Sequence, residues 1–277
     1  MNNFQLRFFS SIILFVPIFF LFNDIDIIFL LVILAILSLS LWEFFRLIDF
    51  RNYSKFQESS GLSFLLGRQK ISFLDIFTIL KINILAILFF FISDNLSSFI
   101  LVIFTLIYFA FFLRNDPYKL LGLIYLSSPF YILMYFRQDE NFETHLFFIL
   151  YFAILTDISS YFAGKIFGGK KIFPKISAGK TIAGSIGGIL IPTFTSVLLF
   201  VGDKNIFLII LTSIFLSIIV QLGDFLESYF KRYCNVKDSS NLIPGHGGVL
   251  DRLDGFFLLI VIIFIIKLLN FNLFFLG

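Results

Sequence analysis

The chain has 277 residues, of which 59% are hydrophobic and only 14% are charged, and its mean hydropathy is +0.99. Soluble domains have about 45–50% apolar and about 25% charged residues, so this composition excludes an ordinary soluble domain. The single cysteine, Cys234, excludes an internal disulfide and a metal site built from cysteines. The net charge of +3 is small, so its distribution matters more than its size.

Long apolar segments recur along the whole chain and predict an all-α, polytopic integral membrane protein. A membrane barrel would alternate apolar and polar residues, which these continuous runs do not. We expect about nine transmembrane helices from the lengths of these runs. They cover approximately residues 7–22, 27–48, 71–93, 97–113, 118–136, 145–162, 186–201, 205–222 and 255–275. The third is the least typical, because Asp75 and Lys81 lie within it.

The distribution of basic residues predicts the orientation of these helices. With the N-terminus placed in the cytoplasm, 17 of the 21 lysines and arginines fall in cytoplasmic segments. The short external segments then carry mostly aspartates and glutamates. Cytoplasmic loops are enriched in Lys and Arg, so we expect a cytoplasmic N-terminus and an external C-terminus.

We expect one membrane domain over residues 1–277, with scaffold spans in 1–140 and a functional half in 141–277. Two polar segments interrupt the functional half on the predicted cytoplasmic side. We call residues 157–188 the first polar island and residues 221–254 the second polar island. The loop at 49–70 is interpreted as an ordinary connector whose basic residues lie against anionic lipid head groups.

The first polar island is rich in lysine and glycine, a composition that suits a phosphate-binding loop. Composition alone favours the simpler interpretation of a positively charged cytoplasmic loop with glycines at its turns. Asp157 does not fit that simpler interpretation, because it lies inside the sixth predicted span. A carboxylate at that depth is expected to face a polar cavity, a cation or a lysine.

The second polar island gathers carboxylates and basic residues around a glycine-rich turn. Asp224, Glu227 and Lys231 are spaced to share one face of a helix that continues out of the eighth span. The sequence PGHGG cannot be helical and should fold the chain back, bringing Asp251 and Asp254 near Asp224. Carboxylates without cysteine suit a hard cation such as Mg²⁺. The alternative is a set of surface salt bridges beside a turn.

His246 lies between two glycines of that turn. It could donate a hydrogen bond to a phosphate, act as a general acid or cap a helix. Metal ligation is not expected, because His145 falls on the opposite side of the membrane.

The second polar island closely resembles the signature of the phosphatidate cytidylyltransferases, also called CDP-diacylglycerol synthases. The family pattern is S-x2-K-R-x4-K-D-x5-P-G-H-G-G-x2-D-R-x-D, and this chain has every fixed residue from Ser228 to Asp254 at the right spacing. The first polar island matches more weakly, and the first 140 residues match only in hydropathy. The chain departs from the family pattern at three places. Ser159 and Ser160 replace the usual glycine or alanine pair before Tyr161, Ala178 replaces a proline, and Ala183 replaces a common glutamate.

The resemblance implies that CTP and phosphatidate react to give CDP-diacylglycerol and pyrophosphate. It implies a protein of the inner, cytoplasmic membrane with its active site facing the cytoplasm. The expected partners are CTP, phosphatidate and membrane lipid, with no nucleic acid, and a homodimer is left open. Mg²⁺ is the expected cofactor, and a second cation is left open.

The resemblance also implies roles for individual residues. The expected Mg²⁺ ligands are Asp224 and Asp251, followed by Asp254 and Asp238. The expected phosphate-binding and catalytic residues are Ser228, Lys231, Arg232, Lys237, His246 and Arg252. The expected nucleotide contacts are Ser177, Lys180, Thr181, Gly245, Gly247 and Gly248, the glycines through close backbone approach.

Two other functions remain as alternatives. A CTP-dependent kinase of a polyprenol-type lipid would use a similar nucleotide site but would release CDP instead of pyrophosphate. A secondary transporter would use Asp157 and Lys81 as coupling groups. Transporters place ionisable groups near the midplane in paired halves, whereas the polar groups here cluster at one predicted surface.

Overall fold

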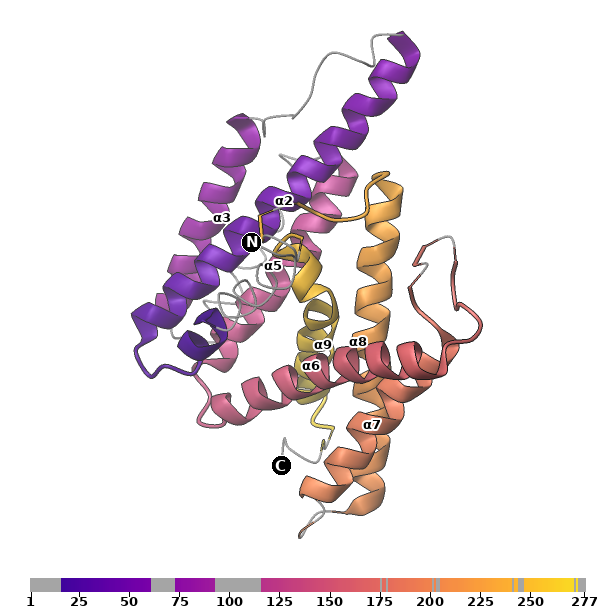
Figure 1. Cartoon of the computed structure of the whole chain (residues 1–277). Coiled ribbons are helices and arrows are strands. Elements are labelled where there is room, and N and C mark those ends of the chain that lie inside the picture. The colour runs from indigo at the N-terminus through magenta and orange to yellow at the C-terminus, as the bar shows by residue number, and fades with distance from the viewer. Residues whose placement is uncertain are drawn as a thin grey trace. The chain divides into compact units, whose positions relative to one another are not determined.

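The computed structural model describes most of the chain as long α-helices (Figure 1). The described residues are 16–60, 73–92, 116–174, 176–177, 179–200, 202, 205–240, 242–243, 247–271 and 273, without the side chains of 53–60 and 73. The helices are α2 (Asp26–Ser60), α3 (Phe73–Phe91), α5 (Pro117–Phe136), α6 (Phe142–Phe167), α7 (Ile182–Phe200), α8 (Ile206–Tyr233) and α9 (Leu250–Leu268). Residues 16–21 are also helical. The predicted all-α class is confirmed.

Six of these helices are long and apolar enough to cross a membrane. These six helices are α2, α3, α5, α6, α7 and α8. The chain is therefore a polytopic integral membrane protein, as the sequence predicts. The predicted span 97–113 and most of 7–22 lie outside the described residues, so the total of nine and the orientation stay predictions.

Two predicted boundaries were wrong. The expected connector at 49–70 begins as helix, because α2 continues to Ser60. No glycine or proline occurs between residue 49 and that point to stop it. The last predicted span was expected to reach residue 275, but α9 ends at Leu268. Asn270 there has a φ of 53°, the left-handed conformation that commonly ends helices.

The chain forms two compact units. The first unit contains Met1–Tyr135 and Tyr233–Arg252, and the second contains Phe136–Arg232 and Leu253–Gly277. The second polar island therefore contributes residues to both units. The predicted functional division near residue 140 stays a prediction.

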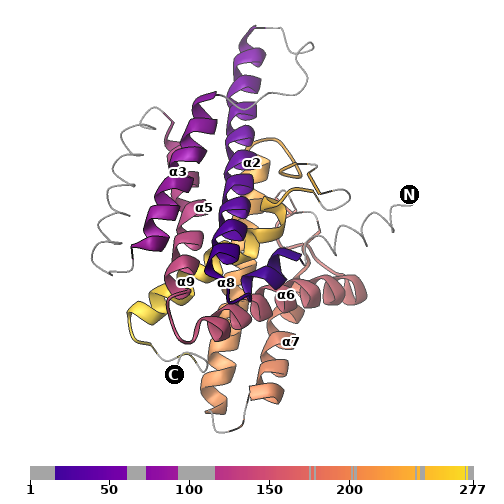
Figure 2. The same ribbon diagram turned by 90° about the vertical axis from the view of Figure 1, so that its left-hand side faces the viewer.

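In the first unit, α2 packs against α3, and Figure 2 shows these helices beside α5. The carboxylate of Asp75 on α3, unexpected in an apolar span, is neutralised by Lys119 on α5. The distance from Lys119 Nζ to Asp75 Oδ1 is 2.8 Å, and Nζ also lies 2.6 Å from Asp49 Oδ1 on α2. This group of three charges, with Asp75 and Lys119 buried and Asp49 half-buried, ties the three helices together.

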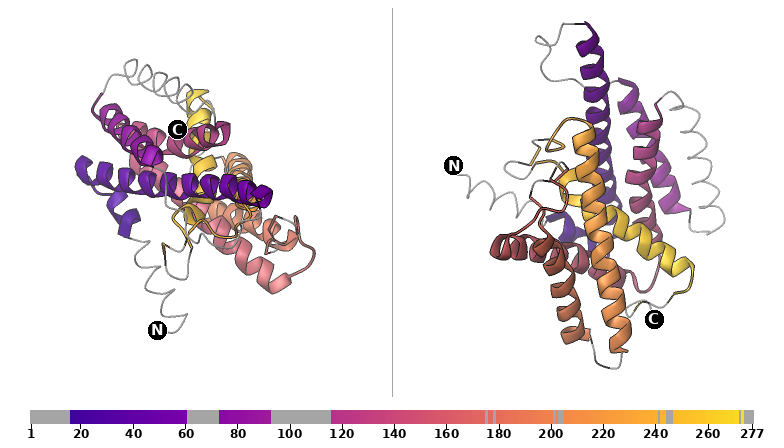
Figure 3. Two further views of the ribbon diagram at one scale, coloured as in Figure 1. Left: turned by 90° about the horizontal axis from the view of Figure 1, so that it is seen from above. Right: turned by 90° about the vertical axis from the view of Figure 1, so that its right-hand side faces the viewer.

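In the second unit, glycines allow close helix packing. A Cβ added to Gly184 of α7 would lie 2.7 Å from the carbonyl oxygen of Ser160 on α6. A Cβ at Gly223 of α8 would lie 2.7 Å from the carbonyl oxygen of Asp254 on α9. Gln221 Nε2 of α8 donates to the carbonyl of Ser185 on α7 at 3.1 Å, and α7 and α8 run side by side in Figure 3. These contacts place α8 beside both α7 and α9.

Candidate active site

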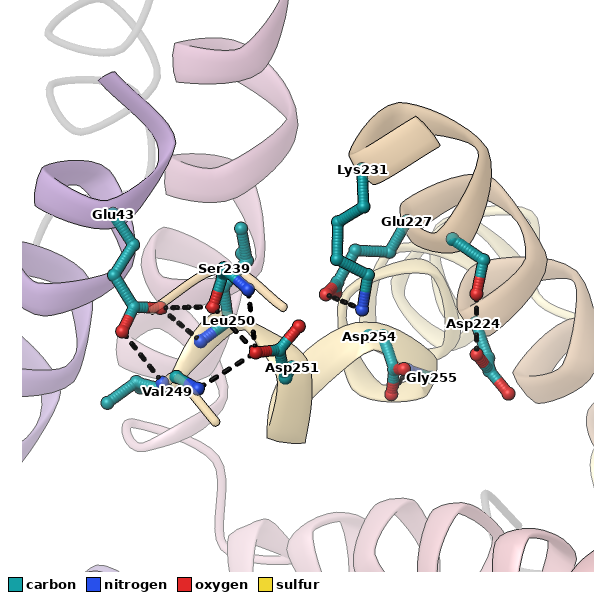
Figure 4. Close-up of polar contacts among 12 residues, drawn as sticks. Glu43, Asp224, Glu227, Lys231, Ser239, Val249, Leu250, Asp251, Asp254 and Gly255 are labelled. Carbon is teal, nitrogen blue, oxygen red and sulfur yellow. Dashed lines mark hydrogen bonds and ion pairs between the residues drawn. The ribbon is translucent and has the colours of Figure 1, made fainter. Parts of the chain in front are cut away.

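The end of α8 carries the first group of predicted site residues. As expected, the helix continues beyond its apolar span to Tyr233. Glu227 and Lys231 are both buried, and 3.1 Å separates Lys231 Nζ from Glu227 Oε1 (Figure 4). Asp224 lies one turn earlier and is half-buried, with Ser228 Oγ 3.5 Å from its Oδ1. The predicted common face of α8 is confirmed.

Lys180 of the first polar island contacts this face. Its Nζ lies 2.5 Å from Asp224 Oδ2, and the Nζ atom is shielded from solvent. Two further contacts fix the same loop on α8. Arg232 Nε donates to the carbonyl of Ile176 at 3.0 Å, and the rings of Phe173 and Phe225 are 4.6 Å apart. Residues of the two polar islands are therefore in contact within the second unit.

The loop of the first polar island has a defined local shape. It leaves α6 at Gly168 and Gly169, whose φ values of 61° and 93° suit glycine. Its two ends then pair, because Ile172 N donates to the carbonyl of Lys180 at 3.2 Å and Ile182 N to that of Lys170 at 3.0 Å. This pairing places Lys180 immediately before α7.

Thr181 begins α7 by capping it. The Thr181 hydroxyl accepts a hydrogen bond from Gly184 N at 3.0 Å, and its side chain is buried. Gly184 and Gly188 pack against Ser160 of α6. Gly184 and Gly188 therefore serve helix packing. The sequence had suggested glycines in a phosphate-binding loop or at turns, but these two lie within α7. Ser177 is half-buried in the loop, and its N–H donates to the carbonyl of Phe173 at 2.9 Å.

Asp254 adds a third acidic side chain close to α8. It lies outside the six candidate spans. Burial raises its pKa well above the usual range, and the carboxylates of Glu227, Asp224 and Asp157 raise it further. The predicted approach of Asp254 to Asp224 is confirmed, and Asp157 on α6 lies near the same carboxylates. Like charges held this close favour a proton or a cation among them.

The turn before α9 belongs to the first unit. Ile243 and Gly247 exchange two backbone hydrogen bonds, of 2.8 and 3.1 Å, and Gly247 has a φ of 86°. The chain therefore folds back here, as PGHGG predicts. Pro244, Gly245 and His246 lie outside the described residues, so the roles considered for His246 stay predictions.

Asp251 holds the two sides of this turn together. Its Oδ2 accepts hydrogen bonds from Ser239 N at 2.8 Å, Ser239 Oγ at 2.9 Å and Gly248 N at 2.8 Å (Figure 4). The predicted metal-ligand role of Asp251 stays a prediction. Lys237, Asp238 and Arg252 are exposed.

Glu43 is a polar residue that the sequence interpretation missed. It lies in the middle of α2 and is fully buried, and both of its carboxylate oxygens accept hydrogen bonds from residues 239–250. A lone carboxylate inside an apolar span is the signal that could have found it. Its partners lie about two hundred positions away, and no local pattern indicates them.

The donor chemistry of the second unit fits a hard cation. Asp224, Glu227 and Asp254 offer carboxylate oxygens, which Mg²⁺ prefers to nitrogen or sulfur, and the charges of Asp224 and Glu227 act on Asp254. Among the described residues, no three of His, Cys, Asp and Glu already converge on a single point. Two of these carboxylates, Asp224 and Glu227, form ion pairs with Lys180 and Lys231.

Comparison with known proteins decides the family. Residues 5–269 match the cytidylyltransferase family. The chain belongs to the cytidylyltransferase family. The family resemblance seen in the second polar island is therefore confirmed, and the match extends into the first 140 residues, where hydropathy was the only likeness.

Relatives of this family member include three bacterial proteins named phosphatidate cytidylyltransferase. The Staphylococcus haemolyticus protein is 39% identical over 180 residues, which is 62% of this chain and 65% of that protein. The Bacillus subtilis protein is 40% identical over 141 residues, 49% of this chain and 52% of that protein. The Rickettsia conorii protein is 36% identical over 164 residues, 55% of this chain and 70% of that protein. The matched part thus spans less than two thirds of the first two relatives.

Proposed function

We propose that this chain transfers the cytidylyl group of CTP to phosphatidate, giving CDP-diacylglycerol and pyrophosphate for phospholipid synthesis. The observation that carries the proposal is the ion pair of Lys180 with Asp224, because it joins the two polar islands at one place in the second unit. Basic and acidic side chains meet there, as a site for a metal-bound triphosphate needs. The name shared by the three relatives supports the same reaction.

The proposed reaction exchanges one phosphoanhydride bond for another. A phosphate oxygen of phosphatidate bonds to the α-phosphorus of CTP, and the bond from that phosphorus to the oxygen that bridges it to the β-phosphorus breaks. The electron pair leaves with pyrophosphate. Because the attacking phosphate is already ionised near neutral pH, the reaction needs no strong general base. The barrier lies in bringing anions together and in stabilising the departing charge.

Cationic side chains address that barrier. Lys180 and Lys231 have ammonium groups held by Asp224 and Glu227, so they are already oriented before any substrate binds. Arg232 is exposed, and its Nε is held by the carbonyl of Ile176. We assign these three residues to the phosphates of CTP and phosphatidate. Their fixed positions lower the reorganisation needed during the reaction.

Mg²⁺ is proposed as the cofactor, with Asp224 and Asp254 as its ligands in the second unit. When bound, it neutralises charge on the triphosphate and on the leaving pyrophosphate. Repulsion among the carboxylates around Asp254 is the structural support for a cation there. Asp251 and Asp238 stay expected ligands on the family resemblance alone.

The proposed location is the cytoplasmic side of the inner membrane. One substrate is a lipid and the other a soluble, highly charged nucleotide, so the reaction requires a polar site at a membrane surface. The predicted cytoplasmic position of both polar islands supports this location.

The test is to incubate the purified protein with CTP, phosphatidate and Mg²⁺ in mixed micelles. We expect CDP-diacylglycerol and pyrophosphate in equal amounts, and neither product when Mg²⁺ is chelated. A parallel reaction offers a polyprenol in place of phosphatidate. Release of CDP with a phosphorylated polyprenol, and no CDP-diacylglycerol, would replace this proposal with the lipid kinase alternative.

A further inference from the structure

Glu43 binds a single segment of the chain through four hydrogen bonds. Its Oε1 accepts from Ser240 Oγ at 2.5 Å and from Val249 N at 3.0 Å. Its Oε2 accepts from Ser239 Oγ at 3.0 Å and from Leu250 N at 2.8 Å. All four donors lie in residues 239–250, on both sides of the turn before α9 (Figure 4). One side chain therefore holds both ends of that turn.

The cost of burying Glu43 makes these contacts strong determinants of conformation. A carboxylate taken out of water is expensive unless several donors satisfy it. Here two donors are serine hydroxyls, and two are the amides at the start of α9, where the helix dipole favours negative charge. If the segment took another shape, the carboxylate would lose these donors while it stayed buried.

Arg46 strengthens the same attachment from α2. It lies one turn after Glu43, and its Nη2 donates to the carbonyl of Ser239 at 2.6 Å. The guanidinium also lies 4.8 Å from the ring centre of Trp42. Two side chains of α2 thus hold Ser239, Glu43 through the serine hydroxyl and Arg46 through the backbone carbonyl.

The contacts of Glu43 continue to Asp251, a residue of the family signature. Ser239 Oγ lies 3.0 Å from Glu43 Oε2 and 2.9 Å from Asp251 Oδ2. Gly248 is needed between them, because a Cβ there would lie 1.9 Å from Ser239 Oγ and 2.5 Å from Glu43 Oε1. The orientation of Asp251 therefore depends on the conformation that Glu43 imposes.

We propose that Glu43 is a positioning residue for the cytidylyl transfer. It touches no substrate, and it holds Ser239, Ser240, Val249 and Leu250 in the positions that orient Asp251. The inference rests on the proposed function for its catalytic consequence, but the ordering of the segment can be measured without any activity. No motif links Glu43 to the signature, since Glu43 lies in a largely apolar span far from the signature in the sequence.

The experiment compares Glu43→Gln with Asp75→Asn. Glutamine keeps the size of the side chain but turns one acceptor oxygen into a donor, so one of the amides of Val249 and Leu250 loses its partner. Asp75→Asn is the control, because it alters another buried carboxylate of the first unit and leaves Lys119 paired with Asp49. The measurements are hydrogen exchange of peptides covering 239–250, thermal stability, and kcat and KM for CTP.

We expect both variants to lower the melting temperature. Only Glu43→Gln should speed exchange in 239–250, by roughly 10-fold or more, because a buried amide that loses its partner destabilises the ordered segment. Only Glu43→Gln should also lower kcat by roughly 10-fold or more, with a smaller change in KM, as expected when a reacting group is misplaced.

Two results would overturn the proposal. In the first, Glu43→Gln keeps both the wild-type protection of 239–250 from hydrogen exchange and the wild-type kcat. In the second, Glu43→Gln loses that protection, but kcat per folded molecule is unchanged. Should wild-type protein form no CDP-diacylglycerol while Glu43→Gln still loses protection, the proposed function fails and the ordering by Glu43 is supported. If Glu43→Gln does not fold, Ser240→Ala removes one donor and leaves the carboxylate three. Faster exchange and a lower kcat in Ser240→Ala support the proposal, and wild-type values of both overturn it.

Discussion

Lys180 and Asp224 form an ion pair in which 2.5 Å separates Nζ from Oδ2. The pair joins the loop before α7 to the polar C-terminal part of α8. The two residues come from separate polar islands of the sequence. Their pairing means that the lysine-rich island is more than a positively charged loop. It contributes a cation to the carboxylates of the second polar island.

Lys180→Ala should therefore lower kcat/KM for CTP by roughly 10²-fold, the usual effect of removing one fixed electrostatic element from an active site. Lys180→Arg keeps the positive charge, so its kcat/KM for CTP should fall less than that of Lys180→Ala. The measurement is CDP-diacylglycerol formation at varied CTP. The control is Lys170→Ala in the same loop, whose side chain is exposed. Equal losses for Lys170 and Lys180 would mean that the loop acts only through its overall charge.

Gly184→Ala should destabilise the second unit. The added Cβ would lie 2.7 Å from the carbonyl oxygen of Ser160, and a backbone atom cannot move away cheaply. Overpacking of this kind costs about 1–3 kcal/mol, measurable as a lower melting temperature in detergent. Gly179→Ala is the matched control, because nothing lies within 4 Å of a Cβ at that position. A Gly184→Ala protein as stable as Gly179→Ala would contradict the packing of α6 on α7.

Cys234 should react slowly with thiol reagents. Burial raises the pKa of its thiol from 9.0 to about 11, so the neutral thiol predominates until the pH approaches that value. At pH 8 the reactive thiolate is then about 100-fold scarcer than for an ordinary cysteine, before any effect of access. Maleimide labelling followed by mass spectrometry measures this. The variant Cys234→Ser/Gly179→Cys provides an exposed thiol for comparison, and equal rates for the two thiols would refute the burial of Cys234.

How much of the site the sequence predicts depends on the range of the interaction. The common face of α8, the turn before α9 and the approach of Asp254 to Asp224 follow from helix spacing and from a glycine-rich turn. Lys180 could be proposed only from the family resemblance, because its partner lies on another helix. Glu43 was missed, since its role depends on a contact between α2 and residues 239–250 that no local pattern encodes.

Boundaries were less predictable than the helices themselves. Hydropathy locates the apolar part of α2 but not its extension to Ser60, a polar stretch without a glycine or proline to end the helix. The early end of α9 depends on the left-handed backbone of Asn270. Hydropathy does not indicate this end, because apolar residues flank Asn270 on both sides. In both places local backbone conformation, rather than transfer into lipid, sets the end of the helix.

The orientation of the helices gives a prediction that does not involve catalysis. Alkaline phosphatase fused after Gly277 should be active, because the C-terminus is expected outside the cytoplasm, whereas fusion within residues 235–245 should be inactive. The reasoning is the excess of Lys and Arg in the segments assigned to the cytoplasm. The reverse pattern of activity would place the candidate site on the side of the membrane that lacks CTP.

The most direct test of the central claim is the activity of Asp224→Asn over a full Mg²⁺ titration. The change is nearly isosteric, removes the partner charge of Lys180 and weakens an oxygen ligand for a hard cation. We predict a fall in CDP-diacylglycerol synthesis of at least ~10² at every Mg²⁺ concentration. Glu143→Gln, at the exposed start of α6, should be neutral. Wild-type activity of Asp224→Asn throughout the titration would contradict the assignment of this cluster as the active site.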